Sequence, residues 1–182
     1  MVILFKIVYS KIINDTINDS FLPKEVKIHI DNKNDKRASL YAWYVLNQLV
    51  FKTYGKNLNE FNFSYNKNGK PLFDEFYVSL SHSDEMIVVA LSDFNIAIDL
   101  QKIYPNKDYK LLISNLCINP NTSKYDFIKY FTQKEVMVKY HGLKLGYPKK
   151  QLYNNDDVAS ITLFDDYILS YYPKVEVELF NK

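Results

Sequence analysis

The chain has 182 residues, of which 47% are hydrophobic and 16% are aromatic, which is enough for a sizeable core and excludes an intrinsically disordered protein. Its 23 basic and 21 acidic residues leave a net charge of only +2, so the overall charge predicts no nucleic-acid partner. The single cysteine, Cys117, excludes an internal disulfide framework and a zinc site built from cysteines.

The apolar segments of the sequence predict neither a signal peptide nor a membrane partner. The opening MVILFKIVYSKII contains Lys6 and Lys11 and has no cleavage site of small residues, which favours a first strand over a signal peptide. No apolar run in the sequence approaches the roughly 20 residues that a bilayer span needs. A lone thiol fits a reducing compartment, so we expect a cytoplasmic protein.

The chain is predicted to open with a strand and a long helix. Residues 2–9 are almost all apolar and predict a buried strand. Residues 31–55 change to helical spacing with a broad apolar face, and Gly55 is the expected end of this helix. Arg37 belongs to a basic cluster near the helix start, for which a solvated surface and a phosphate-binding role both remain open.

Short strands are predicted next. Residues 61–65 alternate in polarity as a strand does, and the turn at residues 66–71 contains Gly69, which tolerates positive φ. The close spacing of three further strands predicts an antiparallel meander rather than parallel strands linked by helices. These three strands are expected at residues 76–81, 86–91 and 96–101.

The rest of the chain predicts two helices followed by strands. Residues 107–117 predict a short helix, and a longer one begins after a cap among residues 121–123. The longer helix is expected to reach about Tyr140, with Gly142 as its stop. Final strands are predicted at residues 160–164, 167–172 and 175–180.

This order of elements predicts an α+β fold made of two similar halves, each an antiparallel sheet packed on a long helix. The expected boundary lies near residues 101–106, which gives an N-terminal half of residues 1–101 and a C-terminal half of residues 102–182.

Three acidic and basic residues form a candidate metal and phosphate site. Glu135 and Lys139 are four apart in the longer helix, so they project from one face with Cβ atoms about 5–6 Å apart. Such a pair is usually an exposed ion pair, but beside a cleft it can bind a metal through the carboxylate and a phosphate through the ammonium. Asp99 ends an apolar strand. It is either a solvated strand end or, if it meets Glu135, half of a magnesium site.

The segment Ser81-His82-Ser83 follows one of the predicted strands. A histidine between serines is usually a hydrogen-bonded loop residue, and the absence of a Gly-x-Ser-x-Gly elbow argues against a serine hydrolase. A turn of small residues exposes backbone N–H groups, and the imidazole and hydroxyls can bind a phosphate. Lys70 and Arg37 are further cations for such a site.

Four segments together resemble the 4′-phosphopantetheinyl transferase superfamily, in particular its longer, monomeric class that activates peptide synthetases. They are similar to the family's Gly-Lys-Pro turn, its Ser-His-Ser loop, its strand with a central aspartate, and its helix with a Lys-Glu pair and a second lysine. The matching segments are GKP at residues 69–71, VSLSHS at 78–83, IAIDLQKI at 96–103 and FTQKEVMVKYHGLKL at 131–145.

The resemblance implies an enzyme that transfers the phosphopantetheine arm of coenzyme A to a serine of an apo carrier protein and releases 3′,5′-ADP. The implied fold is a pseudo-dimer of two α/β halves with coenzyme A in the seam. Asp99 and Glu135 would bind Mg²⁺ and Lys139 would face the diphosphate. Glu135 is also the candidate base for the carrier serine, directly or through a metal-bound water.

The resemblance also implies the residues that bind the nucleotide part of coenzyme A. Ser81 and His82 would hold the 3′-phosphate, Lys70 would lie near the nucleotide, and Arg37 is a further contact. The expected protein partner is an acidic apo carrier protein or carrier domain, docked to a monomer. The lysines that follow the long helix would attract the acidic carrier protein to the site. They are Lys144, Lys149 and Lys150.

The chain departs from the family pattern at three positions. Gln101 replaces the second acid of the strand motif, so we expect weaker magnesium binding through its carbonyl oxygen or a water. Phe131 replaces a tryptophan, and Lys144 stands where a second glycine is usual. Two rival functions stay open: a non-catalytic module that binds coenzyme A or carrier proteins, with a degraded metal site, and a magnesium-dependent phosphohydrolase.

Overall fold

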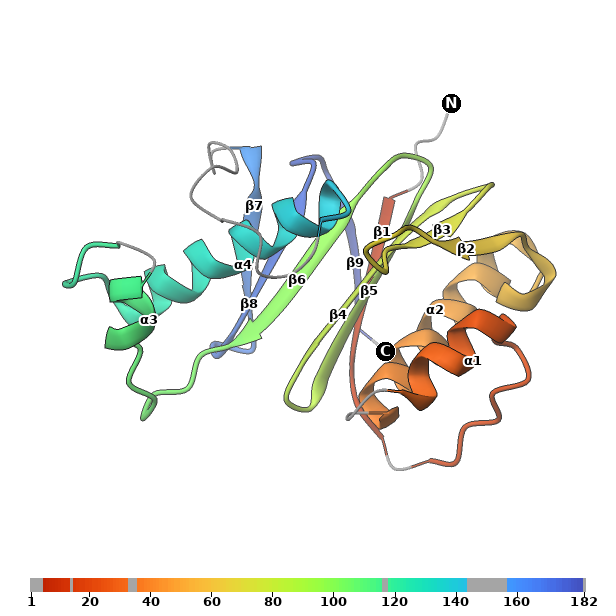
Figure 1. Ribbon diagram of the computed structural model, residues 1–182, viewed down its shortest axis with the longest axis horizontal. Helices are drawn as coiled ribbons and strands as arrows, with labels where there is room; N and C mark the ends of the chain where they lie inside the picture. Colours follow the sequence, from red (N-terminus) through yellow and green to blue (C-terminus); the bar gives the residue numbers. More distant parts are fainter. Residues whose placement is uncertain (1–4, 14, 33–35, 116–117, 144–156, 182) are drawn as a thin grey trace.

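Two sheets, each covered by helices on its outer face, lie against one another in the computed structural model (Figure 1). The structure describes residues 5–13, 15–32, 36–115, 118–143 and 157–181. Helices and strands are mixed along these ranges, which confirms the predicted α+β class. None of the helices in these ranges is both long and apolar enough to cross a membrane.

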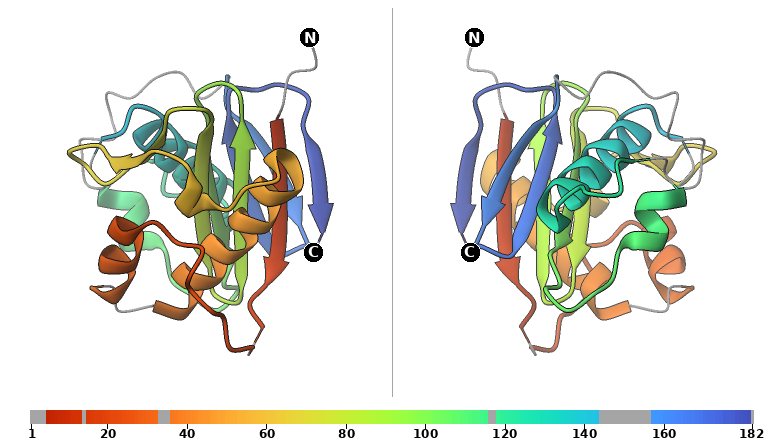
Figure 2. Two further views of the ribbon diagram at one scale, coloured as in Figure 1. Left: turned by 90° about the vertical axis from the view of Figure 1, so that its right-hand side faces the viewer. Right: turned by 90° about the vertical axis from the view of Figure 1, so that its left-hand side faces the viewer.

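The first sheet has the strand order β4-β5-β1-β9. Its strands are β1 (Phe5–Lys11), β4 (Tyr77–Ser83), β5 (Met86–Ser92) and β9 (Glu178–Asn181). Strand β5 pairs antiparallel with β4 and β1, whereas β9 lies parallel beside β1 (Figure 2). Helices α1 (Lys24–Asp31) and α2 (Lys36–Tyr54) cover its outer face.

A short two-stranded ribbon lies beside these helices. It consists of β2 (Phe63–Tyr65) and β3 (Pro71–Phe73), which pair antiparallel after the 3₁₀ turn η1 (Leu58–Glu60). The predicted turn between β2 and β3 is present, and Gly69 takes a φ of 87° there.

The second sheet has the order β6-β8-β7 and is antiparallel throughout. Its strands are β6 (Ala97–Lys102), β7 (Ala159–Leu163) and β8 (Tyr167–Tyr172). Helix α4 (Lys124–Tyr140) packs on its outer face, with α3 (Lys110–Asn115) beside it.

Successive side chains of a strand point to opposite faces, and this alternation determines which residues of β5 and β6 enter the core and which face α4. Both faces of β5 are buried, one against α2 and one against the second sheet. In β6, Ile98 and Leu100 face the first sheet. Because neighbouring residues of a strand point to opposite faces, Asp99 is directed toward α4, where it meets Lys139.

The ends of the long helices follow the predicted capping residues. Ser123 is the N-cap of α4, and its hydroxyl accepts a hydrogen bond from the Asp126 amide at 3.0 Å. Gly142, with a φ of 61°, ends the helix, and the Leu143 amide donates to the Val138 carbonyl. Gly55 ends α2 in the same way, with a φ of 71°.

The predicted antiparallel meander is wrong at its third strand. Strands β4 and β5 form the expected hairpin, but β6 leaves this sheet and pairs with β8. The short bend at residues 93–96 turns the chain onto the second sheet, where the alternate apolar residues of β6 find a second buried layer.

Two further differences concern the chain's organisation. Sheet pairing does not follow the expected boundary between residues 1–101 and 102–182, because β6 belongs to the second sheet and β9 to the first. Helix α1 was not expected from the sequence. It has only eight residues, and it forms because Val26 and Ile30, four apart, are buried against α2.

Candidate functional site

The two sheets meet along β4 and β6, which run side by side in the same direction and are joined through serine side chains. Each of three alternate serines in β4 accepts a hydrogen bond from a backbone N–H of β6, and residues two apart on a strand share one side. The bonds join Ser79 to Ile98 at 3.0 Å, Ser81 to Leu100 at 3.1 Å and Ser83 to Lys102 at 3.0 Å. We call this contact the serine seam.

A cavity of about 530 Å³ opens on the serine seam between α2 and α4. It brings together six of the residues predicted for the site. They are Ser81 and His82 from β4, Asp99 and Gln101 from β6, and Glu135 and Lys139 from α4. We call it the carboxylate cavity; Trp43 and Phe131 are among the aromatic side chains in its wall.

Asp99 is hydrogen-bonded through both of its carboxylate oxygens, and it is only 3% exposed. Its Oδ1 accepts hydrogen bonds from Lys139 Nζ at 2.7 Å and Ser81 Oγ at 3.0 Å. Its Oδ2 accepts one from Gln101 Nε2 at 3.4 Å. A buried carboxylate without partners is costly, and these donors supply hydrogen bonds to both of its oxygens.

Lys139 lies across the serine seam. Besides Asp99, its ammonium donates to the backbone oxygen of Ile98 at 3.0 Å and to Ser81 Oγ at 3.2 Å. Glu135, one turn earlier on α4, is 5% exposed. The cavity therefore holds two buried carboxylates, Asp99 and Glu135, and carboxylate oxygens are ligands that suit a divalent cation.

A buried polar network fixes the helix that carries these groups. Thr132 Oγ1 lies 2.7 Å from Ser170 Oγ, which lies 2.8 Å from Ser160 Oγ. Gln133 Nε2 also donates to Ser160 at 3.1 Å. These bonds join α4 to β7 and β8 and restrict the rotation of Glu135 about the helix axis.

His82 and Phe131 complete the carboxylate cavity. His82 is exposed near the end of β4 and is one of the residues that line the cavity. Phe131 is half-buried on α4.

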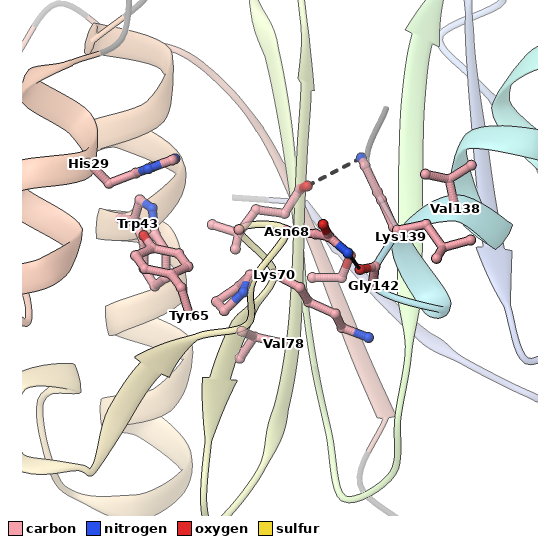
Figure 3. A pocket seen from close by; sticks show the side chains of 14 residues that line it. His29, Trp43, Tyr65, Asn68, Lys70, Val78, Val138, Lys139 and Gly142 are labelled. Carbon is pink, nitrogen blue, oxygen red and sulfur yellow. Dashed lines mark hydrogen bonds between the residues drawn. The ribbon is translucent and has the colours of Figure 1, made fainter. Parts of the chain in front are cut away.

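A second cavity of about 410 Å³ adjoins the first and shares Trp43, Leu80 and Lys139 with it. Figure 3 shows His29, Trp43 and Tyr65 on one side and Val138, Lys139 and Gly142 on the other. We call it the lysine cavity because Lys70 lines it.

Lys70 serves mainly to hold the end of α4. Its Nζ donates to Asn95 Oδ1 at 2.6 Å and to the Tyr140 carbonyl at 3.1 Å. Burial lowers its pKa to about 8. No carboxylate forms an ion pair with Lys70 in the described part of the chain. Its charge therefore faces the negative end of the helix dipole.

Asparagines complete this cap in a way that the sequence did not indicate. Two side-chain amides donate to the Gly142 carbonyl, Asn68 Nδ2 at 2.6 Å and Asn66 Nδ2 at 3.2 Å. Asn95 Nδ2 donates to the Tyr140 carbonyl at 3.2 Å. The last carbonyls of a helix lack partners within it, and here the turn between β2 and β3 and the bend before β6 supply them. Asn66 and Asn68 were predicted only as turn residues, because their acceptors lie more than 70 residues away.

One of the predicted residues lies elsewhere. Arg37 is exposed at the start of α2 and lines a separate hollow with Asp19, Lys27 and Asp31, so the structure does not bring it to the carboxylate cavity. The lysines that were expected to steer a carrier protein, Lys144, Lys149 and Lys150, lie outside the described residues.

The fit to magnesium was judged from the donors that line the carboxylate cavity. The described residues contain no group of three or more His, Cys, Asp or Glu side chains that could hold a metal. Magnesium, however, usually takes one or two protein carboxylates and completes its shell with water and phosphate oxygens. Asp99 and Glu135, with the Gln101 amide beside them, fit such a partial set.

Neither a protein-family model nor a curated protein matches this chain.

Proposed function

We propose that this protein is a magnesium-dependent 4′-phosphopantetheinyl transferase that modifies an acidic apo carrier protein. The observation that carries the proposal is the carboxylate cavity. Its wall brings together Asp99, Glu135, Lys139, Ser81 and His82. Lys139 and Ser81 are hydrogen-bonded there although they are 58 residues apart in the sequence. A chance ion pair on a helix surface would not bring two buried carboxylates, one from strand β6 and one from helix α4, into one hollow.

In this proposal each side chain acts on one part of coenzyme A. Asp99 and Glu135 would hold Mg²⁺, with Gln101 as a third candidate ligand, and the ion would neutralise the diphosphate. Lys139 supplies a fixed positive charge for the diphosphate, and its flexible stem allows it to serve both Asp99 and a phosphate oxygen. His82 would bind the 3′-phosphate at the open side of the cavity.

The reaction is a displacement at phosphorus. The carrier serine oxygen attacks the phosphorus that bears the pantetheine arm, and the bond from this phosphorus to 3′,5′-ADP breaks. Glu135 accepts the serine proton, directly or through a bridging water. Lys139 offsets the charge that develops on the departing phosphate.

The arrangement of elements supports the pseudo-dimer part of the proposal. The chain from β1 to β5 is a strand, a long helix and a hairpin, with the strand order β4-β5-β1. The chain from β6 to β8 repeats this scheme around α4, with the order β7-β8-β6. We propose that these are the two halves, that their boundary lies before β6, and that one chain with both halves acts as a monomer.

One experiment tests the function directly. Purified protein is mixed with Mg²⁺, coenzyme A and an apo carrier protein, and the carrier is read by mass spectrometry, with EDTA and a carrier lacking the acceptor serine as controls. A phosphopantetheine mass gain supports the transferase. Coenzyme A cleavage without carrier modification indicates the phosphohydrolase and would refute the proposal.

A second candidate is favoured by the 2.7 Å ion pair between Lys139 and Asp99 and by the neutral Gln101. A carboxylate that is already paired with a lysine needs no metal. A non-catalytic module that binds coenzyme A or a carrier protein would have such a site. Calorimetric binding of coenzyme A without any carrier mass gain would favour this module over the transferase.

A further inference from the structure

We infer that Ser81 is a positioning residue that holds Asp99 and Lys139 in register, and that it does not bind the 3′-phosphate of coenzyme A. The inference rests on the proposed function, because it assigns a role within the same cavity. It separates Ser81 from its neighbour His82, which the sequence had grouped with it as a phosphate-binding pair.

The hydrogen bonds of Ser81 use the whole capacity of its hydroxyl. A serine hydroxyl has one proton to donate and two lone pairs that accept. Ser81 Oγ donates to Asp99 Oδ1 at 3.0 Å and accepts from the Leu100 amide at 3.1 Å and from Lys139 Nζ at 3.2 Å. With a residue exposure of only 7%, Ser81 offers neither a spare proton nor an open path to a phosphate.

The other serines of the serine seam show what Ser81 adds. Ser79 Oγ accepts from the Ile98 amide and Ser83 Oγ from the Lys102 amide, each at 3.0 Å. Ser79 is as buried as Ser81, at 7% exposure. All three join β4 to β6, but only Ser81 is also hydrogen-bonded to the ion pair. Ser79 and Ser83 are therefore matched controls for the seam bond alone.

The chemistry of this position follows from its three partners. The bond to the Leu100 amide fixes the hydroxyl on the backbone of β6, one residue after Asp99. Its proton then restrains one carboxylate oxygen, and its lone pair restrains the ammonium that faces the same oxygen. Loss of the hydroxyl leaves Asp99 free to turn with Lys139, so the carboxylate is no longer presented at a fixed angle to a cation.

The test compares Ser81→Ala, Ser79→Ala and Ser83→Ala in the full chain, with Ser81→Cys as a variant of nearly unchanged volume. Mn²⁺ is the probe for the metal site, and its binding is measured by electron paramagnetic resonance without coenzyme A. Removal of a residue that orients a metal ligand typically costs about 10–100-fold in affinity. We expect that loss for both Ser81 variants and a change below about twofold for the two control variants.

A second readout separates positioning from phosphate binding. The ratio of the KM values for coenzyme A and dephospho-coenzyme A, measured at saturating Mg²⁺, should stay unchanged in Ser81→Ala. A selective rise in the KM for coenzyme A with unchanged Mn²⁺ binding would overturn the inference. Equal Mn²⁺ losses in all three alanine variants would also overturn it, because the seam alone would then be responsible.

The inference and the proposed function fail in different ways. If the wild-type protein binds Mn²⁺ but modifies no carrier, the transferase is refuted while the Mn²⁺ comparison still tests Ser81. If the wild type modifies the carrier and the Ser81 and Ser79 variants behave alike, the inference fails alone. If the wild type binds no Mn²⁺, both fail.

Discussion

The carboxylate cavity and the lysine cavity share Trp43, Leu80 and Lys139 as a common wall, but they differ in the other charged side chains that line them. The first contains two buried carboxylates, Asp99 and Glu135, beside the ammonium of Lys139. The second holds the ammonium of Lys70, whose partners are an asparagine and a helix carbonyl. The carboxylate oxygens of the first cavity can therefore serve as ligands for a cation, whereas the charge of the second helps to fix α4.

The largest effect is expected from the carboxylate cavity. Replacement Glu135→Ala removes a proposed metal ligand and base, and we expect carrier modification to fall by about 10²–10⁴-fold. Rates are measured by mass spectrometry, with circular dichroism and thermal unfolding to check the fold. The exposed Glu178→Ala of β9 is the control. Near wild-type turnover of purified Glu135→Ala would remove this residue from the mechanism.

A smaller effect distinguishes the histidines of the two cavities. His82→Ala should weaken coenzyme A binding by about 10–100-fold, because a hydrogen bond to a charged group contributes roughly 1.5–3 kcal/mol. Binding of dephospho-coenzyme A should hardly change. Calorimetry with both ligands measures the ratio, and His29→Ala in the lysine cavity is the control. Equal losses for the two ligands would take His82 away from the 3′-phosphate.

A still smaller effect is expected from a substitution of Gln101, the neutral side chain of the proposed metal site. Gln101→Glu adds a charged oxygen donor beside Asp99, and we expect the Mg²⁺ concentration for half-maximal activity to fall by about 3–10-fold. The readout is a metal titration of carrier modification at saturating coenzyme A. An unchanged titration would show that residue 101 lies outside the metal shell.

The smallest effect tests the lysine cavity through pH. The folded-state pKa of Lys70 is lowered to about 8 by burial, so between pH 8 and its unfolded pKa of about 10.4 the unfolded chain binds more protons. Stability should therefore rise with pH across this window, by less than about 1.4 kcal/mol per pH unit because the side chain is partly solvated. Urea unfolding at several pH values measures it.

The Lys70→Met variant is the comparison for this pH effect. It should lose most of the rise, leaving the part due to Lys134, whose pKa burial also lowers. Above about pH 10 the trend should reverse, since burial raises the pKa of Tyr65 and Tyr171 and the folded state then keeps their protons longer. Identical profiles for wild type and Lys70→Met would contradict the assignment.

Local chemistry made several features predictable from the sequence. The caps of α4 at Ser123 and Gly142 depend on single residues with special backbone or side-chain properties. The spacing of Glu135 and Lys139 fixes their common helix face, and the alternation in β6 directs Asp99 away from its apolar neighbours. The helix spacing, together with the resemblance carried by the four segments, was sufficient to name the principal residues of the carboxylate cavity.

Features that depend on distant partners were not predictable in the same way. The serine seam requires β4 and β6 to lie parallel in different sheets, and no local pattern indicates that a serine will accept from a strand 19 residues away. For the same reason Ser81 was grouped with His82, although alternation places them on opposite sides of β4. Arg37 was linked to the site by its charge, which does not specify a direction in space.

The exchange of β6 and β9 between the sheets has a consequence for the integrity of the chain. A cut in the linker between Lys102 and Tyr109 would leave β6 on one fragment and β7 and β8 on the other, while β9 would be separated from β1. Asp99 would belong to the first fragment and Glu135 to the second. Neither piece alone would carry both carboxylates, so activity would report the reassembly of two complementary fragments.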